Sequence, residues 1–191
     1  MPAKAHTRTL TPEQYLAAEK TADYRSEYIE GEVYAMAGAS DANVTLSTNL
    51  SAMLHGQLRG SDCKSYSSDM KLRIGEDKTY FYPDLMVSCD AEDRKRKYFK
   101  CQPILVVEIL SDNTEAYDRG SKFAWYRQLD SLQEYVLIDQ NQFRVELFRR
   151  NAHNRWELFS FEGESALLEL QSVGLRCSLA ELYEDVDFDL V

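Results

Sequence analysis

The centre of the chain reads Pro103-Ile104-Leu105-Val106-Val107-Glu108-Ile109-Leu110, a run in which Glu108 is the sole charge. A run that is apolar on both faces is typical of a central β-strand covered on two sides. A lone carboxylate inside such a strand is costly unless its pKa shifts, a cation pairs with it or a metal binds it. The segment therefore predicts both the middle of a sheet and a candidate site.

A second acid and a lysine accompany Glu108. Asp84 lies in Tyr80-Phe81-Tyr82-Pro83-Asp84-Leu85-Met86-Val87, where the pattern predicts a strand over residues 82–88 with Asp84 on it. Lys122 falls on a helix predicted over residues 118–129, near the carboxyl end of the Glu108 strand. Carboxylate oxygens suit hard cations such as Mg²⁺ and Mn²⁺, and an ammonium nearby stabilises charge that develops on a phosphoryl group. Asp84, Glu108 and Lys122 are thus candidate catalytic residues.

The composition limits the number of domains and the kinds of binding partner that we expect. With 191 residues, of which 44% are hydrophobic, the chain is long enough for one domain with a sizeable core. We expect a single domain over residues 1–191, with a core at about 11–148 and further strands and an acidic tail in 149–191. The net charge of −10, from 22 basic and 32 acidic residues, counts against generic nucleic-acid binding.

Cysteine usage and hydropathy indicate the compartment. The four cysteines show neither the CxxC pairs of a zinc site nor the crowding of a disulfide scaffold, which favours reduced thiols in a cytosol. No segment approaches the roughly 18 apolar residues of a membrane span. We therefore expect a soluble, cytoplasmic protein without a membrane partner.

The remaining pattern alternates helices and strands. Thr11 is a helix N-cap, with Pro12 at the first helical position and Gln14 closing a capping box. Gly31 marks the turn of a hairpin. The predicted helices cover residues 11–20, 41–58, 118–129 and 178–183. The predicted strands after the hairpin cover residues 63–67, 70–74, 82–88, 104–110, 134–139, 144–149, 156–162 and 166–170.

Several motifs together carry a family resemblance: Tyr82-Pro83-Asp84, Val107-Glu108-Ile109-Leu110-Ser111, Asp118-Arg119-Gly120-Ser121-Lys122, Glu134-Tyr135-Val136-Leu137-Ile138-Asp139 and the earlier Glu27-Tyr28-Ile29-Glu30-Gly31-Glu32. The pattern, over residues 11–148, resembles the PD-(D/E)XK nuclease superfamily and, more closely, the family known as "putative restriction endonucleases". The resemblance implies an α/β (α+β) fold with a restriction-endonuclease-like core, a mixed sheet flanked by helices and extra antiparallel strands at both ends.

The same resemblance implies a function and its residues. It implies an endonuclease that cleaves DNA phosphodiesters with Mg²⁺ or Mn²⁺, in which Asp84 and Glu108 bind the metal and Lys122 stands in for the superfamily lysine. The superfamily places that lysine two residues after the glutamate, where this chain has Leu110, and the family takes it from the following helix instead. Asn43 occupies a position where members often carry histidine. The habits of the fold also imply a homodimer, since two active sites cut both strands in one encounter.

Other interpretations remain open at several residues. Glu108 is alternatively one half of a buried structural ion pair with Lys122 or Arg119. Glu27 and Glu30 are either further acids around the metal or solvated turn carboxylates, and we favour the second interpretation. Asp69 is a similar, weaker candidate.

Alternatives without nuclease activity also remain open, for the basic cluster and for the chain as a whole. The basic cluster of Arg94-Lys95-Arg96-Lys97 with Lys100 suits a phosphate-tracking loop, although charge runs are more often solvated loops. The acidic net charge and the displaced lysine motivate an alternative function, a catalytically weak or inactive binding or assembly module that retains the nuclease fold.

Overall fold

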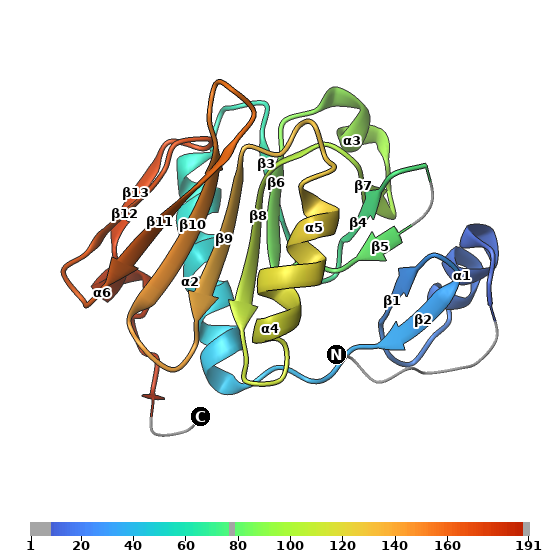
Figure 1. Cartoon of the computed structure of the whole chain (residues 1–191), viewed down its shortest axis with the longest axis horizontal. Helices are drawn as coiled ribbons and strands as arrows, with labels where there is room; N and C mark the ends of the chain where they lie inside the picture. Colours follow the sequence, from blue (N-terminus) through green and yellow to red (C-terminus); the bar gives the residue numbers. More distant parts are fainter. Residues whose placement is uncertain (1–8, 77–78, 189–191) are drawn as a thin grey trace.

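The structure is a computed structural model that describes residues 9–76 and 79–188. At its centre, β8 (Pro103–Leu110) lies inside a six-stranded sheet of order β11-β10-β9-β8-β6-β3 (Figure 1). β8 runs parallel to β9 (Glu134–Asp139) and antiparallel to β6 (Leu85–Ser88), so the sheet is mixed. The other strands of this sheet are β3 (Lys64–Ser67), β10 (Arg144–Arg150) and β11 (Trp156–Glu162), with β3 and β11 at its edges.

Two smaller sheets complete the fold. One has five strands in the order β2-β1-β5-β4-β7, and the other pairs two strands near the C-terminus. The strands of the first are β1 (Ser26–Ile29), β2 (Glu32–Ala35), β4 (Lys71–Ile74), β5 (Thr79–Phe81) and β7 (Phe99–Lys100). The pair consists of β12 (Leu167–Leu170) and β13 (Leu175–Ser178). The predicted mixed sheet with flanking helices and additional antiparallel strands is confirmed.

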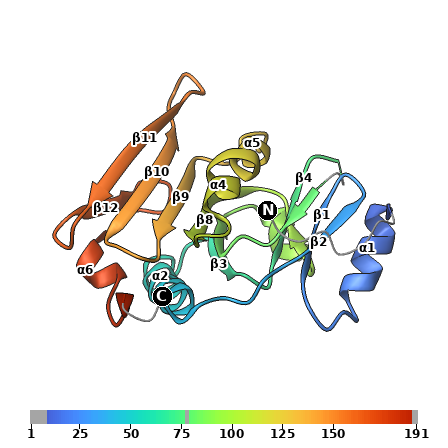
Figure 2. The same cartoon turned by 60° about the horizontal axis from the view of Figure 1, so that its bottom comes forward.

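The alternation of side chains along β8 separates two cores. Leu105, Val107 and Ile109 pack in the cluster that includes the buried leucines of α2 (Asp41–Gln57). Val106 and Leu110 pack in a second cluster with residues of α5 (Phe123–Tyr126). Because successive strand residues point to opposite faces, Glu108 faces α5. Figure 2 shows α2 and α5 on opposite sides of this sheet.

The helices follow their sequence signals closely. At α1 (Pro12–Glu19), the Thr11 side chain accepts a hydrogen bond from Gln14 N and the Gln14 side chain accepts one from Thr11 N, as predicted. The helical region predicted over residues 118–129 differs from the prediction: it begins earlier, at Glu115, and residues 118–122 of it are π-helical. The remaining helical segments are α3 (Ala91–Lys95), α4 (Glu115–Tyr117), η1 (Asp118–Lys122) and α6 (Leu179–Leu182).

One predicted strand is wrong in a way that moves a candidate residue. Of the segment expected as one strand over residues 82–88, only β6 is a strand, and residues 82–84 form the connection from β5 of the five-stranded sheet to β6 of the six-stranded sheet. Pro83, which has no N–H for a ladder, lies between them. Asp84 is therefore in a bend immediately before β6 and not on a strand. β13 was also not predicted.

The cysteine prediction is wrong for one pair. Lys64 of β3 pairs with Ser88 of β6 in antiparallel register, which brings the flanking Cys63 and Cys89 together. These two cysteines form a disulfide, whereas Cys101 and Cys177 are free and buried. The 26-residue separation in sequence gave no signal for this pairing, which depends on the register of two strands.

The single domain expected over residues 1–191 and its acidic tail in 149–191 include positions 1–8, 77–78 and 189–191, which lie outside the described residues. Within the described ranges, the helices are too short or too polar to cross a membrane.

Candidate functional site

Lys122 lies among three carboxylates from three elements. Its Nζ atom is 2.9 Å from Glu108 Oε1 on β8, 3.3 Å from Glu27 Oε1 on β1 and 3.6 Å from Asp118 Oδ1 on η1. All four side chains are buried, with the lysine 6% exposed. Burial opposes the charged ammonium, but Glu108 and Glu27 outweigh it and raise the pKa of Lys122.

The helical segment around Lys122 explains its position. Asp118, Lys122 and Tyr126 are spaced four apart and so project from one side of η1 and α5. The Tyr126 hydroxyl donates a hydrogen bond of 2.6 Å to Glu108 Oε1, the same oxygen that Lys122 contacts. The Lys122 ammonium also lies 5.6 Å from the centre of the Phe81 ring. A π-helical turn of this kind often marks a functional site.

Asp84 reaches the same region from the bend before β6. Its Oδ2 atom accepts a 2.7 Å hydrogen bond from the backbone N–H of Ile109, the residue after Glu108. Burial raises the pKa of Asp84 to about 6, although the Ile109 N–H and the charge of Lys122 both act in the opposite direction. Burial likewise raises the pKa of Glu108 well above its ordinary value, against the charge of Lys122. The structure thus brings the three predicted residues to one place.

The charges in this cluster are unbalanced. Asp84, Glu108, Glu27 and Asp118 are four carboxyl groups beside one ammonium, which gives −4 + 1 = −3 when all are ionised. Two of these acids already bind their protons unusually tightly because of burial. A divalent cation bound to these carboxylates would relieve the repulsion between their negative charges.

The donor set fits a hard cation only in part. Carboxylate oxygens are the ligands that Mg²⁺ and Mn²⁺ prefer, and such ions commonly take one or two carboxylates and complete their shell with water and phosphate. Across residues 9–76 and 79–188, no three Asp, Glu, His or Cys side chains are grouped so as to hold a metal ion. Asp84 and Glu108 supply two such carboxylates, so water or substrate would have to supply the other ligands.

Glu27 and Glu30 were given the same interpretation from the sequence, but they lie in different environments. Glu27 is 5% exposed, pairs with Lys122 and accepts a 3.4 Å hydrogen bond from Tyr82 N. The favoured interpretation of Glu27 as a solvated turn residue is therefore wrong. Glu30 is exposed at the hairpin turn with a φ of 47°, away from these contacts, as a turn residue should be.

Asn43 and Asp69 also differ. The Asn43 side chain lies 3.5 Å from the carbonyl oxygen of Ile109, whose N–H is bound by Asp84, so the two side chains hold adjacent groups of β8. Asp69 is on the surface, where it forms an ion pair with Arg25. Asn43 is thus beside the cluster and Asp69 is outside it.

Three further residues of the site were not among the candidates. Asp118 contacts Lys122, Tyr126 contacts Glu108, and Tyr117 directly precedes Asp118. The spacing of four on either side of Lys122 is a signal for the first two. Arg119, the alternative partner considered for Glu108, pairs with Glu115 and Glu146 instead.

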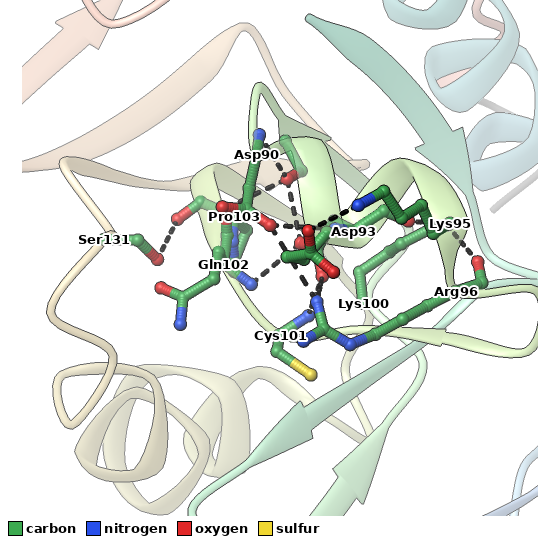
Figure 3. Close-up of polar contacts among 11 residues, drawn as sticks. Asp90, Asp93, Lys95, Arg96, Lys100, Cys101, Gln102, Pro103 and Ser131 are labelled. Atoms are coloured by element: carbon green, nitrogen blue, oxygen red, sulfur yellow. Dashed lines mark hydrogen bonds and ion pairs between the residues drawn. The ribbon is translucent and has the colours of Figure 1, made fainter.

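The basic cluster at residues 94–100 is largely neutralised by its own surroundings (Figure 3). The buried Asp93 carboxylate accepts hydrogen bonds from Arg96 and from the N–H groups of Cys101 and Gln102. Lys100 is buried and donates to the carbonyl oxygens of Asp93 and Arg96. Arg94 pairs with Asp62 and Lys95 with Glu92. These contacts order the connection between β6 and β8 and pair Arg94, Lys95, Arg96 and Lys100 with groups of the chain itself.

Known proteins resemble this chain over most of its length. Two uncharacterized proteins of Synechocystis sp. are each 38% identical, one over 94% of this chain and 94% of its own length, the other over 86% and 94%. A crystal structure described as a putative nuclease belonging to DUF820, from Anabaena variabilis, superposes with a TM-score of 0.74 at 18% identity, covering 91% of this chain and 97% of that one. That likeness confirms the fold.

The family assignment comes from the sequence itself. The model of the Uma2 family matches residues 12–180, which is most of the chain and includes every element of the acid and lysine cluster. The resemblance to restriction endonucleases inferred from the Asp84, Glu108 and Lys122 motifs is confirmed. The chain belongs to the family described as "Putative restriction endonuclease".

Proposed function

We propose that the protein is an endonuclease that hydrolyses DNA phosphodiester bonds with Mg²⁺ or Mn²⁺. The observation that carries the proposal is the excess of acidic over basic groups in the cluster, four carboxyl groups beside Lys122 alone. A structural ion pair needs only one acid for one lysine, whereas a cation site needs the surplus. The family description and the nuclease title of the structural neighbour support the same chemistry.

Each residue has a separable role in this proposal. Asp84 and Glu108 would hold the cation through carboxylate oxygens, and Ile109 N–H fixes one oxygen of Asp84. When bound, the cation would polarise a phosphoryl oxygen and lower the pKa of a water molecule. Tyr126 and Lys122 both contact Glu108 Oε1 and so orient that carboxylate. Lys122 also places a positive charge where the phosphoryl group develops negative charge.

Calorimetry and cleavage assays test the proposal together. Mn²⁺ is titrated into wild type, Asp84→Asn and Glu108→Gln, and each protein is then incubated with labelled plasmid and single-stranded DNA. We expect wild type to bind Mn²⁺ and to nick DNA, and both activities to fall at least a hundredfold in each variant. Circular dichroism must show that the variants keep the wild-type spectrum. Mn²⁺ binding that is equal in all three proteins would refute the roles of Asp84 and Glu108.

The proposed substrate also implies an assembly. Cutting both strands of a duplex in one encounter requires two active sites, which a symmetric dimer provides. Size-exclusion chromatography with light scattering should give twice the chain mass of 22.1 kDa. A monomer at micromolar concentration that still linearises plasmid in one step would contradict the dimer.

A second candidate function is a non-catalytic binding or assembly module. The favouring observation is that Lys122 already has a carboxylate within 4 Å on three sides, which is how a buried lysine is satisfied in a structural role. On this alternative, wild type binds no Mn²⁺, and Lys122→Met unfolds the protein as readily as the loss of either acid. The same calorimetry therefore separates the two functions.

A further inference from the structure

The hydroxyl group of Tyr117 is inaccessible to solvent and has no hydrogen-bond partner among the residues described. A buried polar atom that stays unpaired destabilises the folded state, so native proteins rarely keep one without a reason. Such a group often binds a ligand or water when the site is filled. Tyr117 therefore needs an explanation that the protein's own contacts do not supply.

The position of Tyr117 in the chain places this residue next to the acid and lysine cluster. Tyr117 ends α4, directly before the π-helical segment η1. Because a π-helical turn brings residues five apart into successive turns, Tyr117 and Lys122 lie along the same side of the segment. The charges of Glu27, Lys122 and Asp118 all act on the pKa of Tyr117, which agrees with that placement.

The other donors of the cluster are already committed. Lys122 has three N–H groups and three carboxylates within 4 Å. The Tyr126 hydroxyl donates to Glu108, and the Tyr135 hydroxyl donates to the carbonyl oxygen of Asp118 at 3.0 Å. Of the donors that the structure describes here, Tyr117 retains a free O–H.

We propose that the Tyr117 hydroxyl donates a hydrogen bond to a non-bridging oxygen of the substrate phosphodiester. The inference rests on the proposed function and adds a substrate-binding residue to it. A neutral donor is well suited to this site, because a further cation would bind the carboxylates before it bound the phosphate. Burial, and next the charge of Glu27, raise the pKa of this phenol, so it keeps its proton and acts only as a donor.

The test compares Tyr117→Phe with Tyr183→Phe. Tyr183 is a matched control because its hydroxyl is also buried but is bonded to the carbonyl oxygens of Asp139 and Arg144 at 2.7 and 2.8 Å. Binding of a labelled duplex oligonucleotide is measured by fluorescence anisotropy with Ca²⁺, an oxygen-binding ion that stands in for Mg²⁺ or Mn²⁺. Thermal unfolding without the oligonucleotide is measured on the same samples.

We expect the two variants to differ both in Tm and in affinity for the oligonucleotide. Tyr117→Phe removes an unpaired hydroxyl, so its Tm should equal or exceed that of wild type while oligonucleotide affinity falls about tenfold, as for a lost hydrogen bond to a charged group. Tyr183→Phe removes the hydroxyl that bonds two carbonyl oxygens and Arg144 N, so its Tm should fall while affinity stays unchanged.

Each contrary result has a separate meaning. If wild type binds the oligonucleotide and Tyr117→Phe binds it equally well, the contact with phosphate is refuted and the proposed nuclease function stands. If Tyr117→Phe loses thermal stability as Tyr183→Phe does, its hydroxyl is a structural donor and the inference fails. If wild type binds no oligonucleotide and cleaves no DNA with Mn²⁺, the proposed function fails and the Tyr117 inference fails with it.

Discussion

Replacing Asp84 with asparagine should stabilise the metal-free protein at neutral pH. The pKa of Asp84 rises from 3.8 to about 6 on folding, chiefly because of burial. The folded protein therefore holds the proton more tightly than the unfolded chain, so the stability from protonated Asp84 is complete below pH 3.8 and is lost as pH rises through about 6. Above that pH the ionised carboxylate destabilises the fold, and asparagine removes the charge.

The magnitude follows from the same shift. At about 1.4 kcal/mol for each pKa unit, the rise from 3.8 to about 6 sets an upper bound of about 3 kcal/mol. Asp84 is partly exposed, so we expect a gain of about 1–3 kcal/mol at pH 7.5, or roughly 2–10 °C in Tm for a chain of this size. The asparagine side-chain oxygen can still accept the hydrogen bond from Ile109 N.

The assay is thermal unfolding in EDTA between pH 4 and pH 8. The difference in Tm between Asp84→Asn and wild type should be greatest above pH 7 and should vanish near pH 4. Asp69→Asn serves as the control, because that acid lies on the surface beside Arg25 and should show no such pH-dependent gain. An Asp84→Asn variant that is no more stable than wild type at pH 7.5 would refute the argument that Asp84 is strained by burial.

Three predictions concern stability away from the site. Replacing both Cys63 and Cys89 with serine should cost about 3 kcal/mol in urea unfolding, and dithiothreitol should lower the Tm of wild type but not of this double variant. Leu50→Ala should cost about 3–5 kcal/mol by the same measurement, since Leu50 is fully buried where α2 meets the central sheet. Glu134→Ala should cost a similar amount, because the buried Glu134 carboxylate bonds Arg149 and the N–H of Ser172; a loss below 1 kcal/mol would contradict this.

Local signals predicted most of the elements. The Thr11 capping box, the glycine of the first hairpin and the apolar periodicity of α2 are each encoded within a few residues, and the structure places those elements as expected. The strand predicted over residues 82–88 is wrong at its start, because residues 82–84 form the connection between β5 of one sheet and β6 of another. Only tertiary pairing shows that β5 and β6 belong to different sheets, so no periodicity within the segment could have placed the start of β6 at Leu85.

The candidate site, too, could be predicted from the sequence only in part. Glu108 could be found because a charge inside an apolar strand is costly in any fold. The role of Glu27 could not be found, because it depends on how the first hairpin joins the five-stranded sheet and turns β1 toward η1. The unpaired hydroxyl of Tyr117 could not be predicted from the sequence either, because an unpaired donor is recognised only after every neighbour has been placed.

The environment of Lys122 limits the part that it can take in catalysis. Glu108 and Glu27 outweigh the cost of burial and raise the pKa of the ammonium, so the lysine stays protonated at neutral pH. A protonated lysine cannot accept a proton from an attacking water molecule. In the proposed mechanism its contribution is electrostatic: it orients Glu108 and lowers the negative potential that four carboxyl groups would otherwise present to a phosphate. In the proposed mechanism the proton acceptor is therefore another group, and a carboxylate of this cluster is the candidate among the residues described.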